Sequence, residues 1–139
     1  MDIHYLSVQE VISINILMIQ KYSPGEQIGI LSQPLLESAV YRLQQSAFGE
    51  DAYPTIIEKS AALFESLGQN HSFQSANKRT AFTTMVVFLR YNGYLFKMDN
   101  KQAVDFTVAM VEHEYSFENL VAIIKEHSTG IEPVPISQK

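Results

Sequence analysis

A buried central helix is predicted by the run Ala81-Phe82-Thr83-Thr84-Met85-Val86-Val87-Phe88-Leu89, which is apolar on nearly every side. A helix without a polar face must be covered by other elements, so the rest of the fold is expected to pack around it. This helix is expected to begin near Ser75 or Ala76. The pair Asn92-Gly93, a typical helix stop, is expected to end it.

Helix starts recur on both sides of this run. They are marked by capping or first-turn residues, which in chain order are Ser7 with Glu10, Pro34, Thr55 with Glu58, Asn100 and Ser116. Apolar residues follow each start at helical spacing. The exception is Tyr94-Leu95-Phe96, which favours a short strand. The sequence therefore predicts an all-α bundle of about six helices.

Length and composition favour one globular domain. The chain has 139 residues, of which 46% are hydrophobic and 18% charged, and this is enough to bury a core without covalent staples. There is no cysteine, which excludes disulfides and thiolate metal sites. We expect residues 1–128 to form the domain and residues 129–139, with Pro133 and Pro135, to form a flexible tail.

Net charge and hydropathy argue against duplex DNA and membranes as binding partners. A net charge of −5 argues against direct binding of duplex DNA, which takes many Lys and Arg contacts to phosphates. No signal peptide and no apolar stretch of membrane-spanning length is recognisable, so we expect a cytoplasmic protein without membrane contact. Any anion-binding site must therefore be local.

One polar segment stands out between two apolar helices, Asn70-His71-Ser72-Phe73-Gln74-Ser75-Ala76-Asn77-Lys78-Arg79-Thr80. Lys78 and Arg79 fall in the first turn of the predicted helix, where the helix dipole disfavours cations unless an anion is bound. His71 is suited to accept a proton near neutral pH, and the Asn77 amide can both donate and accept. Together they favour phosphoryl or nucleotidyl transfer.

Simpler interpretations of single residues remain. A lone histidine is more often a cap or a surface residue, and we interpret His4, His113 and His127 in that way. The spacing of Ser75 and Lys78 also matches an S-x-x-K acyl-transfer motif, but its companion S-D-N and K-T-G elements are missing. Walker A, G-x-G-x-x-G and H-E-x-x-H motifs are missing as well.

The segment resembles the H-x-F-x-[DE]-x-N-[GK]-[RK] signature of the Fic/Doc superfamily. Its Asn77-Lys78-Arg79-Thr80 variant is similar to the death-on-curing (Doc) branch, the toxins of prophage and plasmid addiction modules. Further stretches resemble that branch at the expected spacings, namely residues 35–39, 48–55, 58–67 and 92–94. The resemblance implies a single-domain Fic-like helical bundle with the signature loop between two central helices.

The resemblance also implies an activity. A Doc-like toxin transfers the γ-phosphate of ATP to a protein hydroxyl, a threonine of translation elongation factor Tu, and so blocks translation. It would thus be a Ser/Thr protein kinase. His71 would be its general base, and Asn77, Lys78, Arg79 and Thr80 would hold the nucleotide phosphates. Lys78 stands where AMP-transferring members have glycine, and it would fill part of their phosphate pocket. The implied partner is a small antitoxin whose C-terminal helix lies in a groove on the toxin.

Ser75 departs from the family pattern. The family has an acidic residue there that helps to place Mg²⁺, whereas a hydroxyl is a weaker ligand for that ion. Leu31 and Ser32 also replace the Arg and Asp that Doc-like chains often carry. Three alternatives therefore stay open beside an active ATP- and Mg²⁺-dependent kinase: a weak or silent member acting as a binding protein, an AMP transferase and, more distantly, a DNA-binding module.

Overall fold

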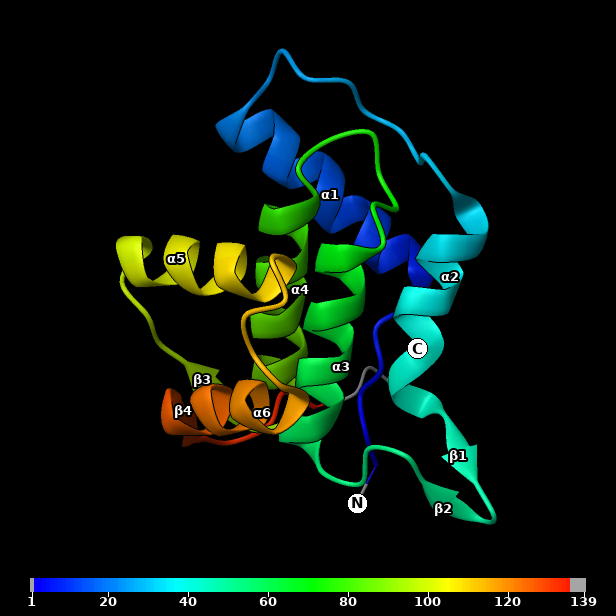
Figure 1. The fold of residues 1–139 in the computed structure, drawn as a ribbon, viewed down its shortest axis with the longest axis vertical. Coiled ribbons are helices and arrows are strands. Elements are labelled where there is room, and N and C mark those ends of the chain that lie inside the picture. The colour runs from blue at the N-terminus through cyan, green and yellow to red at the C-terminus, as the bar shows by residue number, and fades with distance from the viewer. Residues whose placement is uncertain (1, 136–139) are drawn as a thin grey trace.

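The fold is a helical bundle in which α3 and α4 run side by side through the middle of the molecule (Figure 1). A computed structural model describes residues 2–135. Its helices are α1 (Val8–Tyr22), α2 (Gln33–Tyr41), the short 3₁₀ helix η1 (Arg42–Gln44), α3 (Ile56–Gln69), α4 (Asn77–Tyr91), α5 (Asn100–Val111) and α6 (Phe117–Glu126). The predicted all-α fold with six α-helices is thus confirmed for the described residues.

Two antiparallel strand pairs complete the fold. β1 (Ser46–Ala47) pairs with β2 (Glu50–Asp51), and β3 (Tyr94–Phe96) pairs with β4 (Ser128–Gly130). The predicted strand at residues 94–96 is therefore confirmed. The β1–β2 hairpin lies just before α3, at the opposite end of that helix from the loop that leads into α4 (Figure 1).

Side-chain caps explain where most of the helices begin. Ser7, Ser32, Thr55, Asp99 and Ser116 each accept a hydrogen bond from a backbone N–H in the first turn of the helix that follows. Two predicted starts were one residue off. α2 begins at Gln33, with Ser32 as its cap and Pro34 as its second residue. α5 is capped by Asp99, which forms a reciprocal capping box with Gln102 and so displaces Asn100 from that role.

α4 is central, as its sequence predicted. Its residues Ala81, Met85, Phe88 and Leu89 are fully buried, because α1, α3, α5 and β3 all pack against it. Four phenylalanines join these elements: Phe64 stacks on Phe106 with ring centroids 5.0 Å apart, and Phe82 meets Phe96 edge-on at 5.8 Å.

The predicted flexible tail begins at residue 129, and the structure places part of it. Thr129 and Gly130 belong to β4, and the Ile131 N–H donates to the Gly93 carbonyl at 2.8 Å. Gly93 adopts φ +96°, so it can turn the chain from α4 into β3. Residues 136–139 of the predicted tail lie outside the described part, and its flexibility stays a prediction.

No helix within residues 2–135 is long and apolar enough to cross a membrane.

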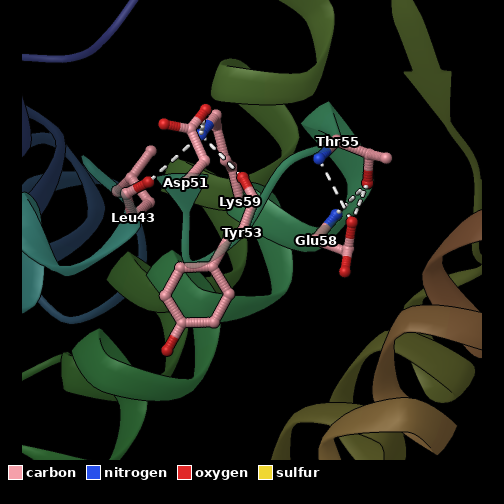
Figure 2. A network of polar contacts seen from close by, with 6 residues as sticks. All are labelled: Leu43, Asp51, Tyr53, Thr55, Glu58 and Lys59. Atoms are coloured by element: carbon pink, nitrogen blue, oxygen red, sulfur yellow. Dashed lines mark hydrogen bonds and ion pairs between the residues drawn. The ribbon is translucent and has the colours of Figure 1, made fainter. Parts of the chain in front are cut away.

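A buried lysine fixes the β1–β2 hairpin to the bundle. Lys59 of α3 is only 1% exposed, and its Nζ donates to the Tyr53 carbonyl at 2.6 Å and to the Leu43 carbonyl at 3.4 Å. It also meets the Asp51 carboxylate at 3.4 Å (Figure 2). A charge this deep in a protein is tolerated only when its hydrogen bonds are satisfied. Lys59 therefore connects η1, the hairpin and α3.

Replacing Lys59 by Met should destabilise the fold by about 2–3 kcal/mol, because it leaves the Tyr53 and Leu43 carbonyls without their donor. The measurement is the urea midpoint of unfolding. Lys101→Met is the matched control, because Lys101 is exposed and pairs only with Asp105 on its own helix, and its midpoint should stay at the wild-type value. Equal midpoints for the two variants would contradict the role of Lys59.

Candidate active site

The loop before α4 ends in a helix start without a side-chain cap. Ala76 occupies the N-cap position with φ +60°, and it has no side-chain atom that could accept a hydrogen bond. α4 is the only α-helix of the described chain that begins in this way. The N–H groups of its first turn are therefore left to meet another acceptor. With the positive end of the helix dipole, they favour an anion.

A cavity of about 880 Å³ opens at this helix start. Its wall comes from α1, α4 and α5 and includes Met18, Phe82, Val104 and Val108. Its charged or titratable lining residues are Lys21, Tyr22, Glu26, His71, Lys78 and Arg79. The volume is in the range of small-molecule sites, and cations outnumber the single carboxylate on the lining. Although the chain is acidic overall, this site is locally positive.

The predicted base and the predicted cations meet in this cavity. His71 lies in the loop with φ +52° and is exposed, and Lys78 and Arg79 are exposed in the first turn of α4. All three line the cavity. None of the other three histidines does. His71 is therefore exposed on the cavity that Lys78 and Arg79 also line, and it is not buried against hydrocarbon.

Asn77 shapes the loop with both ends of its amide. Its Oδ1 accepts from the Phe73 N–H at 3.0 Å, and its Nδ2 donates to the Phe73 carbonyl at 2.9 Å. Phe73 is itself buried in the core. Asn77 lines the cavity, but its side-chain hydrogen-bonding groups are engaged by the loop. These two bonds show that Asn77 holds the turn, and its predicted contact with a nucleotide phosphate stays a prediction.

Thr80 was predicted to contact phosphates, but the structure places it elsewhere. It is 1% exposed, lies outside the cavity lining, and its Oγ1 accepts from Asn15 Nδ2 at 3.0 Å. The same Asn15 amide donates to the Ser75 carbonyl at 3.0 Å. Thr80 thus lies on the side of α4 that packs against α1. Together with Asn15, it connects α1 to the loop.

Ser75, the predicted metal position, also turns away from the cavity lining. Its hydroxyl donates to the Gln27 carbonyl at 2.6 Å. The bond joins the signature loop to the α1–α2 loop, where the Leu31 N–H donates to the Ser72 carbonyl and the Gln74 N–H to the Gly29 carbonyl. Residues 2–135 contain no group of three or more His, Cys, Asp or Glu placed to hold a metal ion. At the position of the family acid, this chain therefore offers a hydroxyl that already donates to Gln27, and the predicted role of Ser75 in metal binding stays a prediction.

Several lining residues were not predicted from the sequence. They are Lys21, Tyr22 and Glu26 near the end of α1, and Asn100, Val104 and Val108 on α5. Only the helix break at Ser23-Pro24 could have drawn attention to Lys21 and Tyr22. The α5 residues carry no local signal, because their place on the wall depends on how α5 packs beside α4.

The sequence of this chain is similar to that of a known protein family. The Fic/DOC family model matches residues 5–89. The chain is similar to Toxin Doc of Mycolicibacterium smegmatis, with 40% identity over 75 residues that cover 54% of this chain and 58% of that relative. It is also similar to Protein kinase doc of Escherichia phage P1, with 27% identity over 123 residues that cover 87% and 93% of the two chains. The first alignment thus spans less than two thirds of its relative.

Replacing Asn77 by Ala should loosen the loop, since it removes both hydrogen bonds to Phe73. If the free energy of opening the loop falls by about 1–2 kcal/mol, the backbone amide of Phe73 should exchange with solvent roughly tenfold faster. Hydrogen exchange followed by NMR measures it. The exposed Asn119, whose side chain is not needed for the α6 cap, provides the control variant Asn119→Ala. Unchanged exchange at Phe73 would refute the clamp.

Proposed function

The chain belongs to the Fic/Doc family, and on this premise we propose that it is a toxin of a toxin–antitoxin module that transfers the γ-phosphate of ATP to a protein hydroxyl. The observation that carries the proposal is the meeting of His71, Lys78 and Arg79 in one cavity at the uncapped start of α4. The names of the two relatives, a toxin and a protein kinase, support it.

The phosphates would be held at the start of α4. The first-turn N–H groups and the positive helix end offer hydrogen bonds to the negative oxygens, while Lys78 and Arg79 offset charge that develops during transfer. The long apolar wall of α1 and α5 leaves room for the remainder of a nucleotide. Lys78 stands at the position of glycine in AMP-transferring relatives, which favours γ-phosphate transfer over AMP transfer.

His71 would act as the general base. An imidazole nitrogen takes the proton of the target hydroxyl, the hydroxyl oxygen bonds to the γ-phosphorus, and the bond to the β-phosphate oxygen breaks so that ADP leaves. The exposure of His71 at the cavity rim suits a base that must meet a protein substrate. Asn77 would act by holding the loop between His71 and α4, whereas the buried Thr80 would support the site through its bond with Asn15.

The protein partners follow from the family. We propose a threonine of translation elongation factor Tu as the acceptor, so that modification blocks translation in the cytoplasm. We also propose an antitoxin whose C-terminal helix lies in a groove of this chain. Mg²⁺ would accompany ATP, held mainly by the nucleotide phosphates and water, because the Ser75 hydroxyl donates to the Gln27 carbonyl.

A second candidate is a catalytically silent member that binds an antitoxin, a nucleotide or a translation factor. The observation that favours it is again Ser75, which replaces the family acid and lies outside the cavity lining. Both candidates share the fold and the phosphate site. They differ in whether phosphate is transferred.

Incubation of the protein with elongation factor Tu and ATP labelled at the γ- or the α-phosphate separates these candidates. A kinase transfers only the γ-label, an AMP transferase only the α-label, and a silent member neither. We expect γ-label on a threonine of the acceptor. A silent wild type whose Ser75→Asp variant transfers label would establish the second candidate.

His71→Ala should lower γ-label transfer by at least about a hundredfold, because it removes the general base. The circular dichroism spectrum and the unfolding midpoint should stay at their wild-type values, since His71 is exposed and outside the core. His113→Ala, at another exposed histidine with positive φ, is the matched control and should transfer at the wild-type rate. Equal transfer by both variants would defeat the role of His71.

A further inference from the structure

The guanidinium group of Arg79 lies over the ring of Tyr22. Its central carbon is 4.3 Å from the ring centroid, well within the range of a cation–π interaction. Tyr22 is the last residue of α1 and is 53% exposed, so the ring does not belong to the core. Lys21 Nζ lies 5.3 Å from the same centroid. The ring therefore faces two of the cations that line the cavity.

The position of Arg79 in α4 is unfavourable for a cation, so a contact with an electron-rich ring stabilises it. It is the third residue of α4, where the positive helix end repels a cation. Within residues 2–135, no carboxylate forms an ion pair with it. The negative face of the Tyr22 ring is thus the attractive partner that the structure gives this guanidinium before any anion arrives.

We propose that Tyr22 is a positioning residue, which keeps the Arg79 guanidinium directed into the cavity and so raises the affinity for nucleotide phosphates. The inference rests on the proposed function. A flexible arginine loses conformational freedom when it grips a phosphate, and an arginine that is already held by a ring loses less. The contact joins the central carbon of the guanidinium to the ring and takes up none of its N–H groups as a hydrogen-bond donor, so these groups can still donate to phosphate oxygens.

A double-mutant cycle on ATP binding tests the proposal. Tyr22→Leu should weaken ATP binding about three- to tenfold in isothermal titration calorimetry, whereas Tyr22→Phe, which keeps the ring, should bind like the wild type. In an Arg79→Ala background the additional Tyr22→Leu change should have no effect. Tyr41→Leu is the matched control, because Tyr41 is 52% exposed on α2 and lies outside the cavity lining, and it should bind like the wild type.

Two results would overturn the inference while leaving the proposed function intact. If Tyr22→Leu binds ATP like the wild type, the ring does not assist Arg79. If Tyr22→Leu weakens binding equally with and without Arg79, the ring contacts the nucleotide directly and does not act through the arginine. A wild type that binds no ATP would instead overturn the proposed function, and the inference with it.

A measurement without nucleotide checks the contact itself. In the wild type, the ring current of Tyr22 should shift the side-chain Nε–Hε resonance of Arg79 upfield in a proton–nitrogen NMR spectrum. Tyr22→Leu should abolish that shift, and Tyr22→Phe should keep it. An Arg79 resonance that is the same in the wild type and in Tyr22→Leu would show that the guanidinium is not held by the ring.

Discussion

The pair of hydrogen bonds between the Asn77 amide and the backbone of Phe73 is the constraint on which the site depends. It closes the turn between α3 and α4 at a place where Ala76 can offer no cap. Through it, the buried ring of Phe73 fixes the loop to the core, while the first turn of α4 stays open toward the cavity. The turn is thus stabilised from its inner side, and its outer side is left free to meet an anion.

α4 combines two tasks that usually fall to different elements. The turns after its first one are buried among α1, α3, α5 and β3, and this packing gives the helix a fixed direction. Its first turn is exposed and carries Lys78 and Arg79. Phe82 belongs to both regions, since it packs edge-on against Phe96 and also lines the cavity. A rigid core thereby sets where the two cations lie, which a flexible loop could not do.

The sequence predicted those features that depend on local chemistry. Helices were predicted from the capping boxes at Ser7 and Thr55 and from the apolar run that begins at Ala81. The polar segment from His71 to Arg79 predicted the most reactive side chains that line the cavity. Prediction from the sequence was wrong or incomplete where the role of a residue depends on residues far away in the chain. Thr80 directly follows the signature, but its hydroxyl is buried and accepts a hydrogen bond from Asn15, which is far away in the sequence. Tyr22 reaches Arg79 only because α1 ends beside the start of α4, and no spacing along the chain shows this.

Because of its hydrogen bond to Gln27, Ser75 affects two properties of the protein, the anchoring of the α1–α2 connection and the metal-binding capacity of the site. An ionised carboxylate at this position could not donate a proton to the Gln27 carbonyl, so it would repel the oxygen that the serine now holds. An acid at this position would accordingly remove one anchor of the α1–α2 connection, and a second substitution there would be needed to restore it. A change that would strengthen metal binding at residue 75 would thus weaken the order of a neighbouring loop, so the two properties cannot be changed independently.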